Sequence, residues 1–529
     1  MDAAGSAAET FTLTEALRAR ARDSPEKLAA IAADNGRGIT YAQLDAGSSR
    51  LAQLLLEHGV GAGDRVPHLD RNDPAAALLL LAAAKVGAAL VPLNWRLAEP
   101  ELAALVVDCD AKLLFAGPDF IELARRLAGS RSGSGSGSGS ASGRTVALEI
   151  GTGVSSPADG HAARDPRRDG DQDAVVLQLY TSGTTGIPKG VQTTNRNLAK
   201  LTSGLREYWT VDEASRCLVA MPLFHIGGMG WLIVGLVNGA TNVLVPAIEP
   251  RGLLETMESQ RITNAFVVPT VLQMLCDVPG SGQRDWAALR CIGYGASPIT
   301  TTTLKRALQT FGCPFFQVYG MTETTGAIVQ LDAADHDPGG PREHLLRSAG
   351  RAYPWMELQI VEPGTGRALE RNRIGEVRVR GDSVTPGYFR NQAETATALA
   401  SDGWLATGDG GYLDDDGYLF LTDRIKDMIV SGAENVYPIE VEEVIASHPA
   451  IAEVAVFGAP DERWGELVCA AVVTRDGEPP DAEQLIAFAR TRLAGYKLPR
   501  RVHHVAQLPK TGSGKVSKRE LRETFGSPI

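Results

Sequence analysis

A layered α/β fold, with a large N-terminal domain and a small C-terminal α+β domain, is predicted by three features of this sequence. Segments with helical apolar spacing alternate with short apolar runs through the first 93 residues, which is typical of a parallel sheet covered by helices. Short apolar runs that end in glycine- or proline-rich turns recur between residues 174 and 318. Near Ala349 the pattern changes to alternating strands, which predicts a β-rich subdomain, and past Arg424 to a compact α/β unit.

The first elements are three helices and a buried strand. Helical spacing is found at 11–22, 41–56 and 75–86, and an apolar run at 89–93 predicts the strand. The stretch from Ala75 to Val91 is very apolar but contains Lys85 and many alanines. A core helix explains it better than a membrane span, which needs a longer uncharged run.

Residues 129–143 are mostly Gly-Ser repeats. Such a composition cannot bury apolar surface and behaves as a flexible coil. Because α/β patterning continues on both sides, we interpret this segment as an excursion within the large domain.

The middle of the chain carries strands that end in polar loops. The apolar run Ala174 to Leu179 predicts a buried strand, and 195–208 has helical spacing. Apolar runs at 265–268, 291–294 and 315–318 each end in proline- or glycine-rich turns. Open α/β sheets place ligands just beyond the carboxyl ends of their strands, so we expect these loops to converge on one cleft.

The C-terminal part of the chain has a different pattern of predicted elements. Strands are predicted at 358–361 and 375–381, and a domain boundary between Asp423 and Asp427. The domains are therefore expected at 1–424 and 425–529. The elements expected past the boundary are a helix from Pro438 to Ile445, strands at 453–457 and 467–473, and a helix at 482–493.

Composition excludes some classes of protein. The 529 residues suffice for more than one domain, and 52 basic against 63 acidic residues leave a net charge of −11, unlike the basic footprint of a nucleic-acid binder. The six scattered cysteines indicate neither a disulfide framework nor a zinc site, so a reducing cytoplasm fits best. The first ten residues lack a signal-peptide pattern. The sequence leaves open whether the protein forms a homodimer.

The segment from Tyr180 to Gly190 has the composition of a phosphate-binding loop. It reads Tyr-Thr-Ser-Gly-Thr-Thr-Gly-Ile-Pro-Lys-Gly. Glycines let successive N–H groups turn toward one anion, hydroxyl groups add donors, and Lys189 adds a positive charge. It is not a Walker loop, because no Gly-Lys-Ser/Thr closes it. The alternative is an ordinary surface loop.

Five motifs together resemble the adenylate-forming superfamily of acyl-CoA synthetases, peptide-synthetase adenylation domains and luciferases. They are the loop at 180–190, Tyr319 to Glu323, Thr407 to Asp409, Asp423 to Asp427, and Pro509 to Lys515. Their order and spacing match the family from about residue 11 to 523. The resemblance implies that ATP and Mg²⁺ activate a carboxylate as an acyl-adenylate, and that coenzyme A then takes the acyl group.

The resemblance also assigns roles to residues. Glu323 would bind Mg²⁺ with Thr181 nearby, Asp409 the ribose, and Lys515 the reacting carboxylate and α-phosphate, so Lys515, His225, Thr322 and Glu323 form the catalytic set. Lys426 would be the hinge of a mobile small domain, and Gly432 with Ala433 would line the pantetheine tunnel. The residues expected to bind ATP are Thr181, Ser182, Gly183, Thr184, Thr185, Lys189, Gly295, Ala296, Ser297, Tyr319, Gly320, Met321, Thr322, Asp409, Arg424 and Lys515.

The acid is expected to be hydrophobic. Met221 to Val237 contains no Asp or Glu, whereas a buried substrate ammonium would need such a partner. The residues expected around the acyl group are His225, Gly228, Met229, Gly293, Gly295, Gly320 and Gly326. These glycines either leave room for a long or bulky acid or serve backbone turns alone.

Three hypotheses follow. The first is an acid–CoA ligase, the second an acyl-AMP ligase that loads an acyl carrier protein, and the third a silent ATP-binding or scaffold protein. The presence of Lys515, Glu323, Asp409 and Arg424 opposes the third.

Overall fold

The computed structural model describes residues 11–130, 145–151, 156–181, 188–297, 299–424, 427–431, 434–461, 464–475, 480–510 and 516–526. The chain forms two compact units. The first comprises Met1–Glu357 with Arg380–Gly403, and the second Leu358–Val379 with Trp404–Ile529. The predicted boundary at residues 424 and 425, with its hinge, stays a prediction. The Gly-Ser segment at 129–143 falls almost wholly outside the described residues.

A six-stranded sheet in the first unit carries the hydroxyl-rich loop. Its order is β6 (Val146–Glu149), β5 (Leu113–Ala116), β3 (Arg65–Leu69), β4 (Ala89–Pro92), β7 (Val175–Thr181) and β8 (Lys189–Thr194). All pairs are parallel except β7 with β8, which are antiparallel. The buried strands predicted before residue 180 and at 89–93 are confirmed.

Five helices accompany this part of the chain: α1 (Leu13–Asp23), α2 (Tyr41–Glu57), α3 (Ala75–Lys85), α4 (Glu99–Asp108) and α5 (Ile121–Ser130). Thr40 and Gln43 form a capping box that begins α2, as this residue pair favours. Lys85 in α3 is fully buried, and its Nζ lies 2.7 Å from Asp45 Oδ1 and 2.8 Å from Ser49 Oγ. The apolar stretch is therefore a core helix with a paired lysine. Among the described helices none is long and apolar enough to cross a membrane.

The second sheet of the first unit has nine strands. Its order is β15 (Arg351–Ala352), β14 (Gly326–Leu331), β13 (Phe315–Met321), β12 (Cys291–Gly295), β11 (Asn264–Val267), β9 (Arg216–Val219), β10 (Thr241–Leu244), β1 (Leu28–Ala32) and β2 (Gly38–Thr40). The strands from β13 to β1 are parallel, and both edges are antiparallel. The predicted strands at 265–268, 291–294 and 315–318 are confirmed by β11, β12 and β13.

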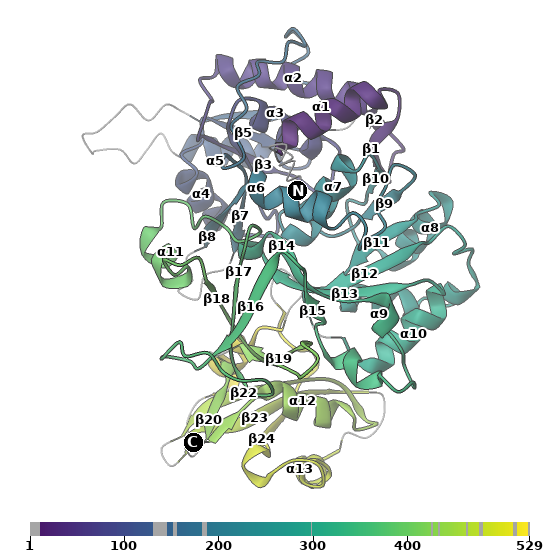
Figure 1. The fold of residues 1–529 in the computed structure, drawn as a ribbon, viewed down its shortest axis with the longest axis vertical. Coiled ribbons are helices and arrows are strands. Elements are labelled where there is room, and N and C mark those ends of the chain that lie inside the picture. The colour runs from purple at the N-terminus through teal and green to yellow at the C-terminus, as the bar shows by residue number, and fades with distance from the viewer. Residues whose placement is uncertain are drawn as a thin grey trace, which may run out of the picture. The chain divides into compact units, whose positions relative to one another are not determined.

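Helices pack on this sheet. Apolar residues of α8 (Pro250–Ser259), α9 (Pro269–Asp277) and α10 (Thr301–Phe311) form one core with Ile292 and Phe315, and Figure 1 shows these helices beside β11, β12 and β13. The other helices are α6 (Asn195–Ala199), α7 (Ile226–Val237) and α11 (Gln392–Ala398).

The helix predicted at 195–208 is wrong in its second half. The α-helix ends at Ala199 and a π-helical turn follows, Lys200–Gly204. Thr202 Oγ1 donates to Leu198 O at 2.8 Å, and Ser203 Oγ donates to Ala199 O at 2.6 Å. Such hydroxyl groups compete with the backbone for helical carbonyls, which apolar periodicity does not reveal.

The second unit contains two antiparallel-rich sheets. One has the order β16 (Met356–Val361), β17 (Gly375–Gly381), β18 (Leu405–Leu413) and β19 (Leu419–Arg424). The other orders β21 (Glu434–Val436), β20 (Ile429–Ser431), β23 (Gly465–Thr474) and β22 (Ile451–Asp461), and β24 (Arg501–His504) pairs with β23. Helices α12 (Pro438–Ala446) and α13 (Ala482–Arg490) share one core with this sheet, and α14 (Lys518–Phe525) shares another.

Candidate active site

The ends of β7 and β8 bring Thr181 opposite Lys189. These two residues are Cα partners in the antiparallel pair, so the strands form the stem of the predicted phosphate loop. Ser182, Gly183, Thr184 and Thr185 lie outside the described residues. The stem therefore presents a hydroxyl group and an ammonium group at the base of the loop.

Lys189 has a carboxylate partner from α11. Its Nζ forms an ion pair with Glu394 Oε2, and its side chain is 13% exposed. The same Nζ lies 5.2 Å from the centroid of the Tyr388 ring. The lysine charge is thus compensated by a residue more than 200 positions later in the chain.

Glu323 is a buried carboxylate beyond the end of β13. It lies in a short 3₁₀ turn, Thr322–Thr324, which directly follows the strand segment of Tyr319, Gly320 and Met321. The residue is 7% exposed, and its Oε1 accepts a hydrogen bond from Tyr388 Oη at 3.0 Å.

The donor set around Glu323 suits a hard cation that is only partly held by protein. Carboxylate and hydroxyl oxygens are what Mg²⁺ prefers, and it usually keeps water and substrate phosphates as further ligands. Within the described ranges, no three His, Cys, Asp or Glu side chains gather to hold a metal ion. Glu323 and the hydroxyl group of Thr181 are oxygen donors of the kind that such a cation takes.

The turn after β12 adopts an unusual backbone conformation. Ala296 has φ of 68°, in the left-handed region that favours glycine. A Cβ at Gly295 would lie 2.4 Å from Val318 O, so only glycine fits there. Ser297 follows, and Pro298 is outside the described residues.

His225 lies at the start of α7, where it is the N-terminal capping residue. Its ring centroid lies 4.6 Å from that of Phe224. The preceding loop is held by Asn72, whose Nδ2 donates to Val219 O at 3.2 Å and Met221 O at 3.0 Å, and whose Oδ1 accepts from Leu223 N at 3.2 Å. One buried amide therefore fixes the backbone that leads to His225.

The predicted acyl-site glycines mostly accommodate close packing. A Cβ would lie 2.2 Å from Pro222 O at Gly228 and 1.8 Å from Gly326 O at Gly320, while Gly326 has φ of 95°. At Gly293 it would lie 2.4 Å from the Phe316 ring. Of the two readings of these glycines, the structure therefore supports the backbone and packing role, not open space.

Aromatic rings fill the sheet face beside Gly293. Phe266, Gly293 and Phe316 are cross-strand partners on β11, β12 and β13. The Phe316 ring stacks on Trp209 at 5.7 Å, and Trp231 of α7 lies 5.6 Å from Trp209 and 6.1 Å from Phe266. Met229, in the same helix, is fully buried. These four rings form an aromatic cluster, Trp209, Trp231, Phe266 and Phe316.

The second unit carries the other predicted residues. Asp409 lies on β18, its N–H donates to Thr407 Oγ1 at 3.1 Å, and its Cα is paired with that of Arg424 at the end of β19. Lys510 and Val516, which flank Lys515 in the chain, form a β-bridge. Lys426, Gly432, Ala433 and Lys515 lie outside the described residues.

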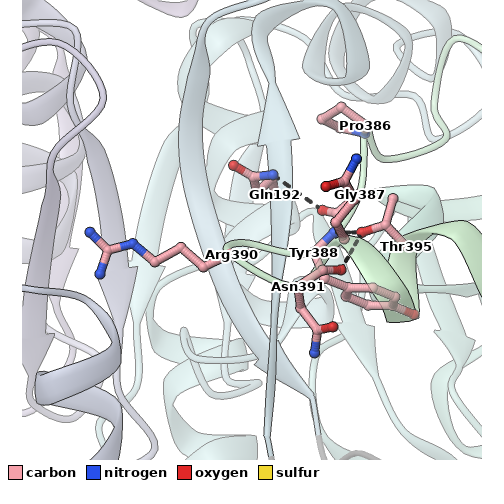
Figure 2. Close-up of a pocket in the computed structure, with 8 residues that line it drawn as sticks. Gln192, Pro386, Gly387, Tyr388, Arg390, Asn391 and Thr395 are labelled. Carbon is pink, nitrogen blue, oxygen red and sulfur yellow. Dashed lines mark hydrogen bonds between the residues drawn. The ribbon is translucent and has the colours of Figure 1, made fainter.

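A pocket of about 370 Å³ lies beside the segment that follows β17 (Figure 2). It is lined by Gln192 on β8 and by Pro386, Gly387, Tyr388, Arg390, Asn391, Gln392 and Thr395. In Figure 2, Arg390 points away from the other labelled side chains, and Gln192 points to Gly387.

Sequence reasoning missed Tyr388, Glu394 and Asn72. None of them lies in the five motifs, and a lone tyrosine, glutamate or asparagine in a polar segment carries no local signal. Only their contacts with Glu323, Lys189 and the loop before His225 distinguish them.

Comparisons with known proteins agree over nearly the whole chain. The family model described as AMP-binding enzyme matches residues 17–389, and the model of the AMP-binding enzyme C-terminal domain matches 440–515. A fatty acid–[acyl-carrier-protein] ligase, ScoC of Streptomyces coeruleorubidus, is 38% identical over 93% of this chain and 92% of its own. A feruloyl-CoA synthase of Amycolatopsis sp. is 37% identical over 96% and 98%. The crystal structure of ATP-bound MatB from Rhodopseudomonas palustris has a TM-score of 0.87 at 30% identity, covering 97% of this chain and 99% of that one.

Proposed function

This chain belongs to the AMP-binding enzyme family, and on that premise we propose that it is an ATP-dependent acid–CoA ligase. It activates a hydrophobic carboxylic acid as an acyl-adenylate with release of pyrophosphate, and then transfers the acyl group to the thiol of coenzyme A. The family predicted from the five motifs and the fold class predicted from the apolar patterning are confirmed. The assignment of the acid, of Mg²⁺ and of individual site residues is our proposal.

The observation that carries the proposal is the pairing of a lysine and a buried carboxylate through one aromatic residue. Lys189 and Glu323 both contact Tyr388, so a cation and an anion are held beside the same ring. This arrangement suits a metal–polyphosphate. Lys189 and the hydroxyl group of Thr181 would bind phosphate oxygens, and Thr322 would contact the α-phosphate.

Mg²⁺, when bound with the nucleotide, would neutralise phosphate charge and so reduce repulsion of the incoming carboxylate. Glu323 would hold it, with Thr181 nearby. The residues of the first unit thereby bind and orient the triphosphate. The turn of Gly295, Ala296 and Ser297, with Tyr319, would bound the adenine.

The second unit would complete the reaction. Asp409 would accept hydrogen bonds from the ribose hydroxyl groups, because one carboxylate can accept from a vicinal diol, and Arg424 would assist there. Lys515 would stabilise the attacking carboxylate and the charge that develops on the α-phosphate. Lys426 would be the hinge of a rotation that exchanges Lys515 for Gly432 and Ala433 along the pantetheine route.

The aromatic cluster supports a compact, ring-bearing acid over a long straight chain. The space beside Gly293 is filled by Phe316 and Phe266, so an acyl group that extended past Gly293 would have to displace two rings. Neither Asp nor Glu stands between Met221 and Val237, which fits an acid without an α-ammonium group. A feruloyl-CoA synthase among the relatives is consistent with this choice.

The alternative acceptor is an acyl carrier protein. It is favoured by one observation, the relative named as a fatty acid–[acyl-carrier-protein] ligase. Both acceptors present the same pantetheine thiol, so the tunnel expected at Gly432 and Ala433 would serve either of them.

An ATP–pyrophosphate exchange assay over fatty, aromatic and terpenoid acids tests the proposal. We expect exchange above background with hydrophobic acids, and the highest kcat/KM with ring-bearing ones. Thioester formation with free coenzyme A, compared with a pantetheinylated carrier protein, then identifies the acceptor. Exchange at background across the whole panel would refute the ligase and support an ATP-binding or scaffold protein.

A further inference from the structure

The segment from Thr385 to Thr395 is fastened along β8. Thr385 Oγ1 donates to Gln192 O at 2.6 Å, and Phe389 N donates to Gly190 O at 2.7 Å. Tyr388 forms a β-bridge with Val191 between these two contacts. The segment thus follows the strand that begins at Lys189, and its backbone is fixed relative to that lysine.

The segment is also held together by hydrogen bonds between its own residues. Tyr388 N donates to Thr395 Oγ1 at 2.9 Å, and that hydroxyl group donates to Asn391 O at 2.8 Å (Figure 2). Asn391 caps α11 by accepting from Glu394 N at 3.2 Å. The positions of Tyr388 and Glu394 are therefore set by hydrogen bonds within the segment.

Two side chains of this segment, Tyr388 and Glu394, contact the charged groups of the site. Tyr388 donates its hydroxyl hydrogen to Glu323 Oε1 at 3.0 Å, and Glu394 forms the ion pair with Lys189. The Glu323 backbone is held as well, because Thr385 N donates to Glu323 O at 2.8 Å. Both the main chain and the carboxylate of Glu323 are thus contacted by the same segment.

A single hydrogen bond to a buried carboxylate has a large effect on its orientation. Hydrogen bonds to charged groups are stronger than neutral ones, and the outer partner of a metal-binding carboxylate typically changes metal affinity or activity about 10–100-fold when it is removed. The phenol of Tyr388 donates to Oε1, so it holds the Glu323 carboxylate in one orientation.

We propose that Tyr388 is a positioning residue for adenylation, which orients the Glu323 carboxylate toward the cation of the metal–nucleotide complex. The proposal rests on the proposed function, in which Glu323 holds that cation. Tyr388 touches neither substrate nor metal in this role. Glu394 pairs with the neighbouring Lys189, whereas the hydroxyl group of Tyr388 contacts Glu323, so the two polar groups contact separate charges from one segment.

The variant Tyr388→Phe keeps the ring that lies beside Lys189 and removes only the hydroxyl donor. We expect the Mg²⁺ concentration that half-saturates ATP–pyrophosphate exchange to rise about tenfold or more. Thioester formation from supplied acyl-adenylate, which needs no triphosphate, should stay within about twofold of the wild type. A direct readout is Mn²⁺ binding by electron paramagnetic resonance, with a non-hydrolysable ATP analogue present, where the half-saturating Mn²⁺ concentration should rise similarly.

Glu394→Gln is the matched variant. It removes the charge that pairs with Lys189 and leaves the contact between Tyr388 and Glu323 intact, so the Mn²⁺ concentration dependence, measured with the ATP analogue at saturating concentration, should be unchanged. The inference is overturned if Tyr388→Phe binds Mn²⁺ as the wild type does, or if Glu394→Gln weakens Mn²⁺ binding equally. Wild-type protein without any exchange activity would refute the proposed function instead, so the two failures are distinguishable.

Discussion

Replacing Asn72 by alanine should impair binding of the acid without impairing binding of ATP. The side chain makes three hydrogen bonds to the loop between β9 and α7. Val219 O keeps a second donor, Val245 N at 3.0 Å, so the loss falls mainly on Met221 O and Leu223 N. At roughly 1 kcal/mol for each net hydrogen bond, the native loop conformation loses about 2 kcal/mol.

That energy sets the size of the kinetic effect. Because every 1.4 kcal/mol corresponds to a tenfold change, about 2 kcal/mol on the loop that ends at His225 raises KM for the acid up to about 30-fold. KM for ATP should change less than about twofold, because the hydrogen bonds of the Asn72 side chain to described residues go to Val219, Met221 and Leu223, which are not among the residues expected to bind the nucleotide. Steady-state exchange kinetics with each substrate varied in turn measure both constants.

A second buried asparagine provides the control. Asn195 accepts a hydrogen bond from Leu13 N at 2.9 Å and donates one to Asp171 O at 2.8 Å. Neither partner belongs to the loop between β9 and α7. Asn195→Ala should lower the apparent melting temperature about as much as Asn72→Ala while leaving KM for the acid unchanged. Equal KM values for the acid in wild type and Asn72→Ala, or an equal rise in both variants, would refute the reasoning.

Three further predictions concern other residues. Lys85→Ala should destabilise the first unit by roughly 2–5 kcal/mol, because it empties the space of a fully buried side chain and removes the cation that pairs with the partly exposed Asp45; urea unfolding measures this, and a loss below about 1 kcal/mol would contradict it. Burial raises the pKa of Asp70 from 3.8 to about 7, so the folded state binds more protons than the unfolded state and stability falls as pH rises through that window, by up to about 4 kcal/mol. Asp70→Asn should remove this slope, measured as the difference in the free energy of unfolding between pH 5 and pH 8. Burial lowers the pKa of His68 to about 4 and gives a slope of the opposite sign, which is common to both proteins and cancels when they are compared. An unchanged slope in Asp70→Asn would contradict the prediction. Lys515→Ala should abolish exchange and spare thioester formation from supplied acyl-adenylate, whereas equal loss of both halves would contradict its assigned role.

Local patterns carried much of the fold prediction. Strands such as β7, β12 and β13 were predictable because a buried strand needs a short run of apolar residues and ends in residues that permit a turn. The helix at 195–208 was predicted too long, since the hydroxyl groups of Thr202 and Ser203 compete for backbone carbonyls in a way that apolar spacing does not record.

The family and the expected site residues came from the sequence alone, because each motif is a contiguous run whose chemistry depends on neighbours in the chain. Tertiary structure decided which residues support them. Tyr388 meets Glu323 across 65 positions, and Asn72 meets Met221 across 149. Such pairs depend on how strands and loops pack, and no local composition specifies them. The same holds for Gly293. Its sequence context allows either open space or close packing, and the rings of Phe316 and Phe266 beside it show that the space is filled.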